Sequence, residues 1–207
     1  MKKLFALVLL FISAFMLITS GCSTKGSVQE TTESNQAQLN EESNNDISTL
    51  IVYYSYTGTT KRVAEHLKNL TSGDLYEITL KEPYNGSDND VSDRVFSERD
   101  NNQMPELSGN LPDINKYDRI LIGTPVWNDS ISNPIMSYLE KQDFSGKTVA
   151  PFWTYITNQG ETESDFSSLV KNADIADCLA LKSANSINDD ELDQMLKNWI
   201  NTINKRK

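Results

Sequence analysis

The sequence predicts an α/β protein in which a doubly wound, five-stranded parallel sheet lies between two layers of helices. Short apolar runs alternate five times with segments of helical periodicity between residues 49 and 204. The first run, residues 49–54, is rich in β-branched and aromatic residues and lacks polar alternation, which is typical of a parallel strand covered on both faces. Regular alternation of strands and helices implies right-handed crossovers and a parallel sheet.

Strands are expected at residues 49–54, 75–80, 119–123, 148–153 and, with a weaker pattern, 179–182. After the first strand, apolar side chains recur at helical spacing at Val63, Leu67 and Leu70, and Gly73 ends that helix. The insertion at residues 83–107 is expected to form a loop with a short helix over residues 91–98.

The later helices carry recognisable start signals. Asn133 and Pro134 are expected to cap and open the helix after the third strand. The last helix is expected to begin near Asn188, where three acidic residues in the first turn suit the helix dipole. The helix after the fourth strand has the apolar residues Phe166, Leu169, Val170 and Ala173.

Residues 1–21 have the features of a bacterial lipoprotein signal peptide. Two lysines precede an apolar run over residues 4–18 that is too short to span a bilayer comfortably. Cys22 directly follows a glycine, which resembles the lipobox, in which the cysteine is acylated and becomes the mature N-terminus. Thr19 departs from the leucine usual three residues before that cysteine. An ordinary secretory signal is the alternative, but a free cysteine is seldom placed on an exposed tail.

Residues 22–47 are expected to form a flexible tether that leads to a single domain over residues 48–207. Residues 23–46 contain no aromatic and almost no apolar side chain, so they cannot bury enough surface to offset the entropy of ordering. A domain of the remaining length buries roughly 70% of its unfolded surface.

The chain is strongly acidic, with a formal net charge of −10. Removal of residues 1–21, which contain two lysines and no acidic residue, changes this charge to −12. Such a surface repels phosphate backbones and anionic headgroups, so we expect no nucleic-acid partner and a membrane contact made by lipid rather than by charge. With Cys22 acylated, Cys178 is the only cysteine left, so neither a disulfide nor a cysteine zinc site can form, and we expect no metal.

The loop after the first strand contains a run of hydroxyl side chains around one glycine: Ser55, Tyr56, Thr57, Gly58, Thr59 and Thr60. At a helix N-terminus, such hydroxyls and the free backbone N–H groups can hold a phosphate, whose charge the helix dipole favours. The run matches neither the Walker loop nor the dinucleotide-binding pattern. A simple helix cap would explain one or two hydroxyls but not all of them. We therefore predict a phosphate site.

This run resembles the FMN phosphate loop of the flavodoxin family, which has the pattern Ser/Thr-x-Thr-Gly-x-Thr directly after the first strand. The resemblance extends over nearly all of the expected domain and is to a short-chain flavodoxin-like lipoprotein. It implies the flavodoxin-like strand order 2-1-3-4-5 and FMN as the cofactor. In such sheets, ligands lie beyond the carboxyl ends of the strands.

The segment after the third strand resembles the Gly-x-Pro-Ile-Trp segment of the family. It implies that the flavin ring contacts Thr124, Pro125, Val126, Trp127 and Asn128. The indole of Trp127 offers a flat face for stacking, although a core position for this residue is the alternative. Asn128, Asp129 and Ser130 stand where the family commonly has another aromatic residue and a glycine, and this departure bears on redox tuning more than on binding.

The segment after the fourth strand resembles the part of the family that wraps the edge of the ring. The contacts predicted there are Thr154, Tyr155, Asn158 and Gly160. Residues 156–159 lack the glycines of the family turn and so lose freedom for positive φ. We therefore expect a narrower pocket or a lower affinity. Trp153 is expected to lie in the core.

The resemblance implies an FMN-binding electron carrier that is lipid-anchored on the outer face of a bacterial cytoplasmic membrane. Its acidic face would dock redox partner proteins. Two alternatives stay open because fold alone does not choose among them. One is an FMN-dependent reductase of quinones or similar small molecules, although the sequence shows no added basic cluster to hold a nicotinamide cofactor. The other is a flavin-free binding module. We expect no catalytic residue, and His66, the only histidine, is expected at a solvated helix position.

Overall fold

The computed structural model describes residues 47–206, and the expected doubly wound α/β fold is confirmed. The predicted signal peptide, Cys22 and nearly all of the predicted tether lie outside the described residues. The strands are β1 (Thr49–Tyr53), β2 (Asp74–Glu77), β3 (Arg119–Trp127), β4 (Ser130–Ile131), β5 (Thr148–Tyr155), β6 (Asp174–Ile175) and β7 (Leu179–Lys182).

The sheet has the order β2-β1-β3-β5-β6, and β7 also pairs with β5. All of these pairs are parallel, so the expected order 2-1-3-4-5 is confirmed. The fifth position is divided, because β6 pairs with the start of β5 and β7 with its end. Pro151 lies in β5 between these two pairings, and a proline has no N–H with which to bond a further strand.

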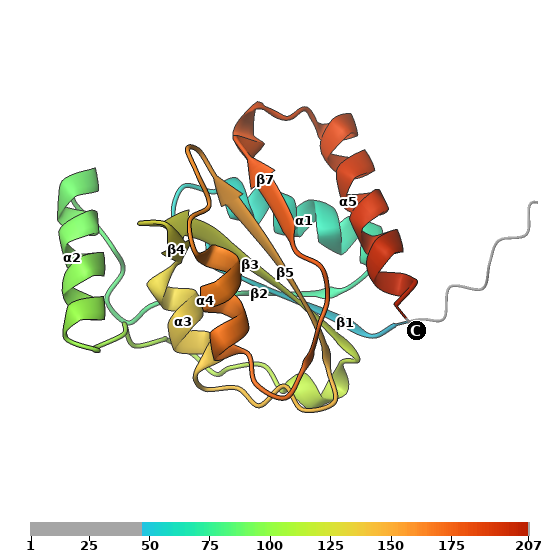
Figure 1. Ribbon diagram of the computed structural model, residues 1–207, viewed down its shortest axis with the longest axis horizontal. Helices are drawn as coiled ribbons and strands as arrows, with labels where there is room; N and C mark the ends of the chain where they lie inside the picture. Colours follow the sequence, from blue (N-terminus) through green and yellow to red (C-terminus); the bar gives the residue numbers. More distant parts are fainter. Residues whose placement is uncertain (1–46, 207) are drawn as a thin grey trace, which may run out of the picture. The chain divides into compact units, whose positions relative to one another are not determined.

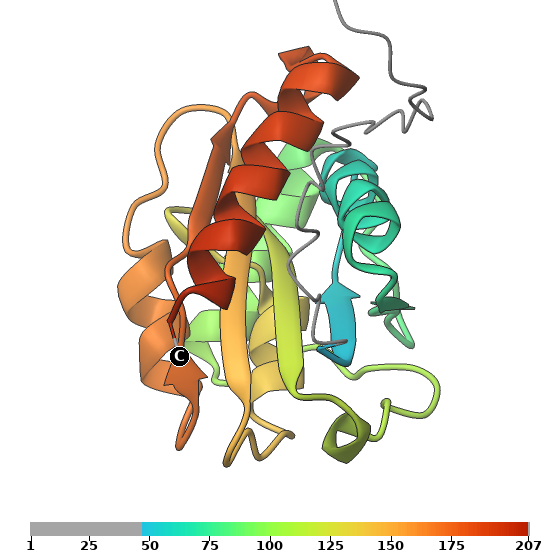
Figure 2. The ribbon, with the colours of Figure 1, turned by 90° about the vertical axis from the view of Figure 1, so that its right-hand side faces the viewer.

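Helices cover both faces of the sheet (Figure 1, Figure 2). The helices are α1 (Thr59–Thr71), α2 (Asp88–Asp100), α3 (Asn133–Leu139), α4 (Thr162–Leu169) and α5 (Asp189–Asn204), with short 3₁₀ turns η1 (Ile114–Lys116) and η2 (Ala184–Ser186). Side chains of α1 and α5 pack on one face, and side chains of α3 and α4 pack on the other. Helix α2 belongs to the insertion and stands beside the sheet at the end where β4 lies (Figure 1).

Strand β1 shows why the apolar runs do not alternate. Leu50 and Val52 are buried under α3 and α4, whereas Ile51 and Tyr53 are buried under α1 and α5. Successive strand side chains point to opposite faces, so a sheet covered twice needs apolar residues at every position.

The end of the third strand differs from expectation. Residues 124–127, expected as a loop, continue β3 because they pair with β5 and then with the antiparallel β4. Asn128 and Asp129 form the two-residue turn between β3 and β4 and have φ values of 48° and 60°. Positive φ at both central residues is typical of tight hairpin turns, and Asn and Asp tolerate it better than most residues. We call residues 126–131 the β3–β4 hairpin.

Other boundaries shift by a few residues. Helix α2 spans Asp88–Asp100, which is longer than expected, because Ser87 and Asp90 form a capping box at its start. Ser132, rather than Asn133, is the N-cap of α3. Asn188 caps α5 as expected, with its side chain accepting a hydrogen bond from the backbone N–H of Glu191.

Candidate functional site

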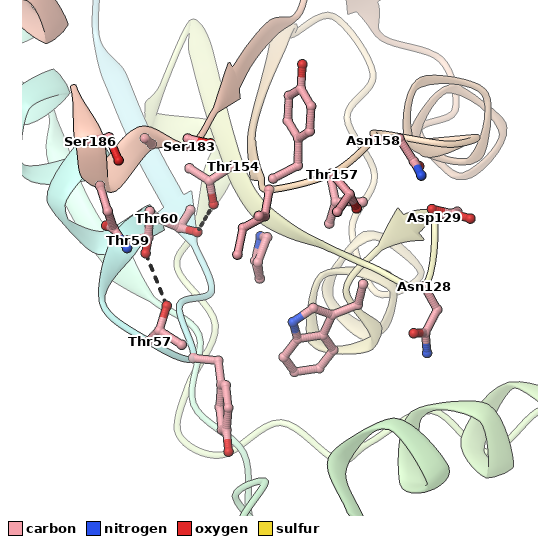
Figure 3. A pocket seen from close by; sticks show the side chains of 18 of the residues that line it. Thr57, Thr59, Thr60, Asn128, Asp129, Thr154, Thr157, Asn158, Ser183 and Ser186 are labelled. Atoms are coloured by element: carbon pink, nitrogen blue, oxygen red, sulfur yellow. Dashed lines mark hydrogen bonds between the residues drawn. The ribbon is translucent and has the colours of Figure 1, made fainter. Parts of the chain in front are cut away.

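A cavity of about 920 Å³ opens at the carboxyl ends of β1, β3, β5 and β7. This volume is near the top of the usual range for small-molecule sites. Figure 3 shows Thr57, Thr59 and Thr60 at one end of the cavity and Asn128, Asp129 and Asn158 at the other, with Thr154 and Thr157 between them. We call these two regions the phosphate end and the ring end, after the parts of FMN that the sequence predicts for them.

The phosphate end is formed by the loop after β1 and the start of α1. Gly58 is the N-cap of α1 and has a φ of 90°, a conformation that glycine adopts at little cost. The hydroxyl groups of Thr57 and Thr59 lie 3.1 Å apart, and the buried hydroxyls of Thr60 and Thr154 lie 2.9 Å apart (Figure 3). The second contact joins the start of α1 to the end of β5.

Two features leave this end ready for an anion. The first turn of α1 contains no acidic residue, so no side chain of that turn neutralises the positive end of the helix dipole. The buried Oγ of Ser55 has no hydrogen-bond partner, and an orphaned buried hydroxyl is costly unless a ligand or water satisfies it.

Arg62 ties α1 to the loop that follows β7. Its guanidinium donates to the carbonyl oxygens of Ala184 at 3.0 Å and Ile187 at 3.0 Å, and it also pairs with Asp189. These contacts bring the 3₁₀ turn η2 beside the phosphate loop, so that residues 183–186 line the cavity.

At the ring end, Trp127 is half-buried and lines the cavity. Three tyrosine rings meet its indole edge-to-face, with centroid distances of 5.5 Å for Tyr54, 5.9 Å for Tyr56 and 4.9 Å for Tyr84. Burial raises the pKa values of Tyr54 and Tyr84 well above the usual range, so both phenols are neutral at physiological pH. The tyrosines hold the indole in place, and the indole also packs against the apolar core on that face of the sheet.

The β3–β4 hairpin is joined to the loop after β5. The backbone N–H of Glu161 donates to the carbonyl oxygen of Asp129 at 2.7 Å. Gly160 has a φ of 50°, and a Cβ at this position would lie 2.2 Å from the same oxygen. Glycine is therefore required at residue 160 by both its backbone conformation and the close approach.

The cavity brings together eleven of the fifteen predicted cofactor contacts: Tyr56, Thr57, Thr59, Thr60, Pro125, Val126, Trp127, Asn128, Thr154, Tyr155 and Asn158. Four of the fifteen do not line it. Ser55 and Gly58 shape the phosphate loop, and Gly160 supports the hairpin. Thr124 is fully buried, and its hydroxyl bonds the carbonyl of Pro125 and the hydroxyl of Ser132, so it braces α3 rather than facing the cavity.

Eight further residues line the cavity: Phe96, Asp129, Ile156, Thr157, Ser183, Ala184, Asn185 and Ser186. The loop after β7 carries no motif, and its place follows from the strand order together with the Arg62 contacts. Phe96 reaches the cavity from α2, which a local sequence pattern does not place.

Trp153, His66 and Cys178 do not line the cavity. Trp153 is fully buried as expected, and its Nε1–H donates to Oε1 of Gln159 at 2.9 Å. His66 is not freely solvated, because its side chain is only 20% exposed and its Nδ1 lies 2.6 Å from Oδ1 of Asp193. Burial raises the pKa of the Cys178 thiol.

Two features are absent from residues 47–206. No helix there is both long enough and apolar enough to cross a membrane. The same residues contain no cluster of His, Cys, Asp and Glu side chains suited to a metal ion.

The fold and the cavity define a doubly wound α/β protein with a ligand site at the switch point of its sheet. The family model for flavodoxin matches residues 48–203 of the chain. The chain therefore belongs to the flavodoxin family.

Solved structures agree with this assignment. A flavoprotein from Lactobacillus acidophilus NCFM, solved in complex with FMN, is 26% identical with a TM-score of 0.62, and the match covers 74% of this chain and 99% of that one. A protein from Bacteroides uniformis is 29% identical with a TM-score of 0.64, and the match covers 72% of this chain and 97% of that one. A protein from Bacteroides eggerthii is 27% identical with a TM-score of 0.66, and the match covers 77% and 99%. No protein of curated function matches the chain.

Proposed function

We propose that this protein binds one FMN and carries electrons between redox partners on the outer face of a bacterial membrane, to which the lipid on Cys22 attaches it. The observation that carries the cofactor assignment is the phosphate end. Three features of this end fit a phosphate monoester. They are the absence of acidic residues from the first turn of α1, the run of hydroxyl groups, and the Oγ of Ser55, which has no hydrogen-bond partner. The flavoprotein of Lactobacillus acidophilus, solved with FMN, supports the same cofactor.

The residues present fit each part of FMN. Thr57, Thr59 and the free N–H groups at the start of α1 would hold the phosphate, and Trp127 would stack on the ring system. Bound FMN supplies one- or two-electron transfer. The chain's own task is then to bind the cofactor, exclude water from one face of the ring and leave an edge open to partners.

The cavity lining favours a carrier over a nicotinamide-dependent enzyme. Among the described residues that line the cavity, there is no lysine, arginine or histidine. The phosphate of FMN is therefore met by dipoles rather than by cations, and no basic cluster is left for the phosphates of a second, nicotinamide cofactor.

The mouth of the cavity supports docking of a protein partner. Three large, exposed hydrophobic side chains line it. Their exposed fractions are 37% for Tyr56, 49% for Phe96 and 79% for Ile156. Acidic residues occupy the first turns of α2, α4 and α5. An apolar cavity mouth on a strongly acidic protein suits a partner with a complementary basic rim.

A second candidate function rests on a smaller cavity. A slot of about 250 Å³ lies between α2 and the indole, with Val91, Val95 and Trp127 among its walls. It has room for a small planar molecule such as a quinone. If the purified protein oxidises NADH rapidly and only when a quinone is added, its function would be the reduction of small molecules rather than electron transfer between proteins.

A titration of the flavin-free, full-length protein with FMN, riboflavin and FAD tests the cofactor assignment. We expect tight binding of FMN and far weaker binding of riboflavin, because riboflavin lacks the phosphate. Thr57→Ala should cost on the order of 1 to 3 kcal/mol of FMN binding, the range for a lost hydrogen bond to a charged group. Thr71→Ala, at the other end of α1, is the matched control and should leave FMN binding unchanged. Equal affinity for FMN and riboflavin would remove the phosphate site.

The membrane assignment is tested separately with Cys22→Ser. We expect this variant to leave the membrane fraction, whereas Cys178→Ser should stay in it. Retention of Cys22→Ser in the membrane would contradict the lipid anchor while leaving the FMN proposal untouched.

A further inference from the structure

Among the described residues, the side chain of Arg99 joins helix α2 to the backbone of the β3–β4 hairpin by hydrogen bonds. Its Nη2 donates to the carbonyl oxygen of Trp127 at 3.2 Å and to that of Ile131 at 3.0 Å, and its Nε donates to Oδ1 of Asn133 at 2.8 Å. Trp127 ends β3 and Ile131 ends β4. The guanidinium therefore bridges the two strands of the hairpin whose tip, residues 128–129, lines the ring end of the cavity.

All three oxygens that Arg99 bonds are neutral. Within residues 47–206, Arg99 forms no ion pair with a carboxylate. The neighbouring carboxylate of Glu98 is occupied by Tyr84, Arg94 and Asn133. The N–H donors of a guanidinium lie in one plane at fixed angles. A half-buried guanidinium that donates to two backbone carbonyls therefore fixes the positions of those carbonyls relative to each other.

Arg94 provides an internal comparison. It lies on the same helix and carries the same charge, but it pairs with Glu98 at 2.7 Å and donates to the carbonyls of Glu82 and Pro83. Those hydrogen bonds lie within the insertion, and the guanidinium also lies 4.2 Å from the centre of the Tyr84 ring, which contacts Trp127. Only Arg99, of the two arginines on α2, bonds the backbone of the hairpin.

The hairpin needs such support. Asn128 and Asp129 both hold positive φ, which costs more for these residues than for glycine. A bond from Glu161 to Asp129 fixes the tip on one side, and Arg99 fixes the base on the other.

We propose that Arg99 is a positioning residue that clamps the β3–β4 hairpin in the conformation in which its tip meets the flavin ring. This inference rests on the proposed function, because the hairpin is taken to contact FMN. It assigns to the insertion helix α2 a direct influence on the cofactor, exerted through the backbone of Trp127 and Ile131.

The experiment compares Arg99→Gln, Arg99→Lys and Arg94→Gln in the full-length protein. Arg99→Gln removes both the positive charge and the guanidinium donors, whereas Arg99→Lys keeps the charge but loses the guanidinium. Arg94→Gln removes the same charge from the same helix. We expect both Arg99 variants to weaken FMN binding about tenfold and to lower the potential of the couple that forms fully reduced flavin. Arg94→Gln should have a smaller effect on both quantities, because Arg94 contacts the ring end through the Tyr84 ring and makes no hydrogen bond to the hairpin backbone.

A second measurement does not involve FMN. In the flavin-free protein, amide hydrogen exchange at residues 128–131 should be at least tenfold faster in both Arg99 variants and unchanged in Arg94→Gln. This readout reports on the hairpin itself, and thermal unfolding shows whether each variant is folded.

Each outcome decides the inference. Wild-type affinity, potential and exchange in Arg99→Lys would show that charge alone acts and would overturn the clamp. Equal effects of Arg94→Gln and Arg99→Gln would assign the effect to general docking of α2 and would overturn it as well. Failure of the wild-type protein to bind FMN would instead contradict the proposed function, while the exchange data would still test the clamp.

Discussion

The two ends of the cavity are built in different ways. The phosphate end comes from one continuous segment, residues 55–60, at the start of a helix whose first turn has no acidic residue. The ring end is assembled from β3, β5, α2 and a hairpin tip with positive φ, and contacts between distant residues hold it together. A helix start and a run of hydroxyls bind a phosphate through local geometry, whereas the place of the ring depends on tertiary packing.

The largest expected effect separates the two indoles near the ring end. Trp153→Ala should lower the free energy of unfolding by about 3 to 5 kcal/mol, because a fully buried tryptophan leaves a large cavity. Trp127→Ala should mainly weaken FMN binding and change the flavin spectrum, since Trp127 is half-buried and lines the cavity. Thermal unfolding and FMN titration of both variants check this, and the reverse pattern would mean that the two roles are exchanged.

The next effect tests the phosphate end by adding an acidic residue to the first turn of α1, as α4 and α5 already have. Thr59→Asp places a carboxylate in the first turn of α1, where it should lower FMN affinity by about 100-fold, or 2.7 kcal/mol, through like-charge repulsion. The same change should leave the flavin-free protein as stable or more stable by about 0.3 to 1 kcal/mol, because an acidic residue suits a helix N-terminus.

Ser167→Asp, on an exposed position of α4, is the control for added charge and should leave FMN affinity nearly unchanged. Undiminished FMN binding by Thr59→Asp, measured by fluorescence titration, would place the phosphate elsewhere.

The same contrast explains how much could be predicted from the sequence. The alternation of strands and helices and the N-cap of α5 follow from local patterns, because periodicity and cap residues act within a few positions. The strand order is implied by the resemblance to flavodoxins, and the phosphate-binding role of the hydroxyl run after β1 stays a prediction. The continuation of β3 to Trp127 could not be read from residues 119–123, since it depends on pairing with β4 and β5. The cavity contacts from residues 183–186 and Phe96 likewise depend on where distant elements pack.

Gly160 offers a smaller effect at the ring end. Gly160→Ala should lower the free energy of unfolding by about 1 to 3 kcal/mol, because the added Cβ would meet the carbonyl oxygen of Asp129 and the residue would hold a positive φ. Gly146→Ala is the matched control, since Gly146 has a φ of 73° but open space around its Cβ position. Denaturant unfolding of both variants isolates the contact, and equal losses would show that backbone conformation alone accounts for the requirement.

The smallest effect concerns the tip of the hairpin. The resemblance to flavodoxins implies that a backbone peptide of this segment meets the N5 edge of the flavin, often after a flip that needs positive φ. Asp129 already holds a φ of 60° and lines the cavity, so glycine at this position would keep the conformation at lower cost. It would also remove a negative charge that opposes the charge of reduced flavin. Asp129→Gly should therefore raise the potential of the couple that forms fully reduced flavin, by about 60 mV for each 1.4 kcal/mol. Redox titration of both proteins at one pH measures the shift. A lower or unchanged potential would show that the hairpin tip does not govern the electronics of the flavin.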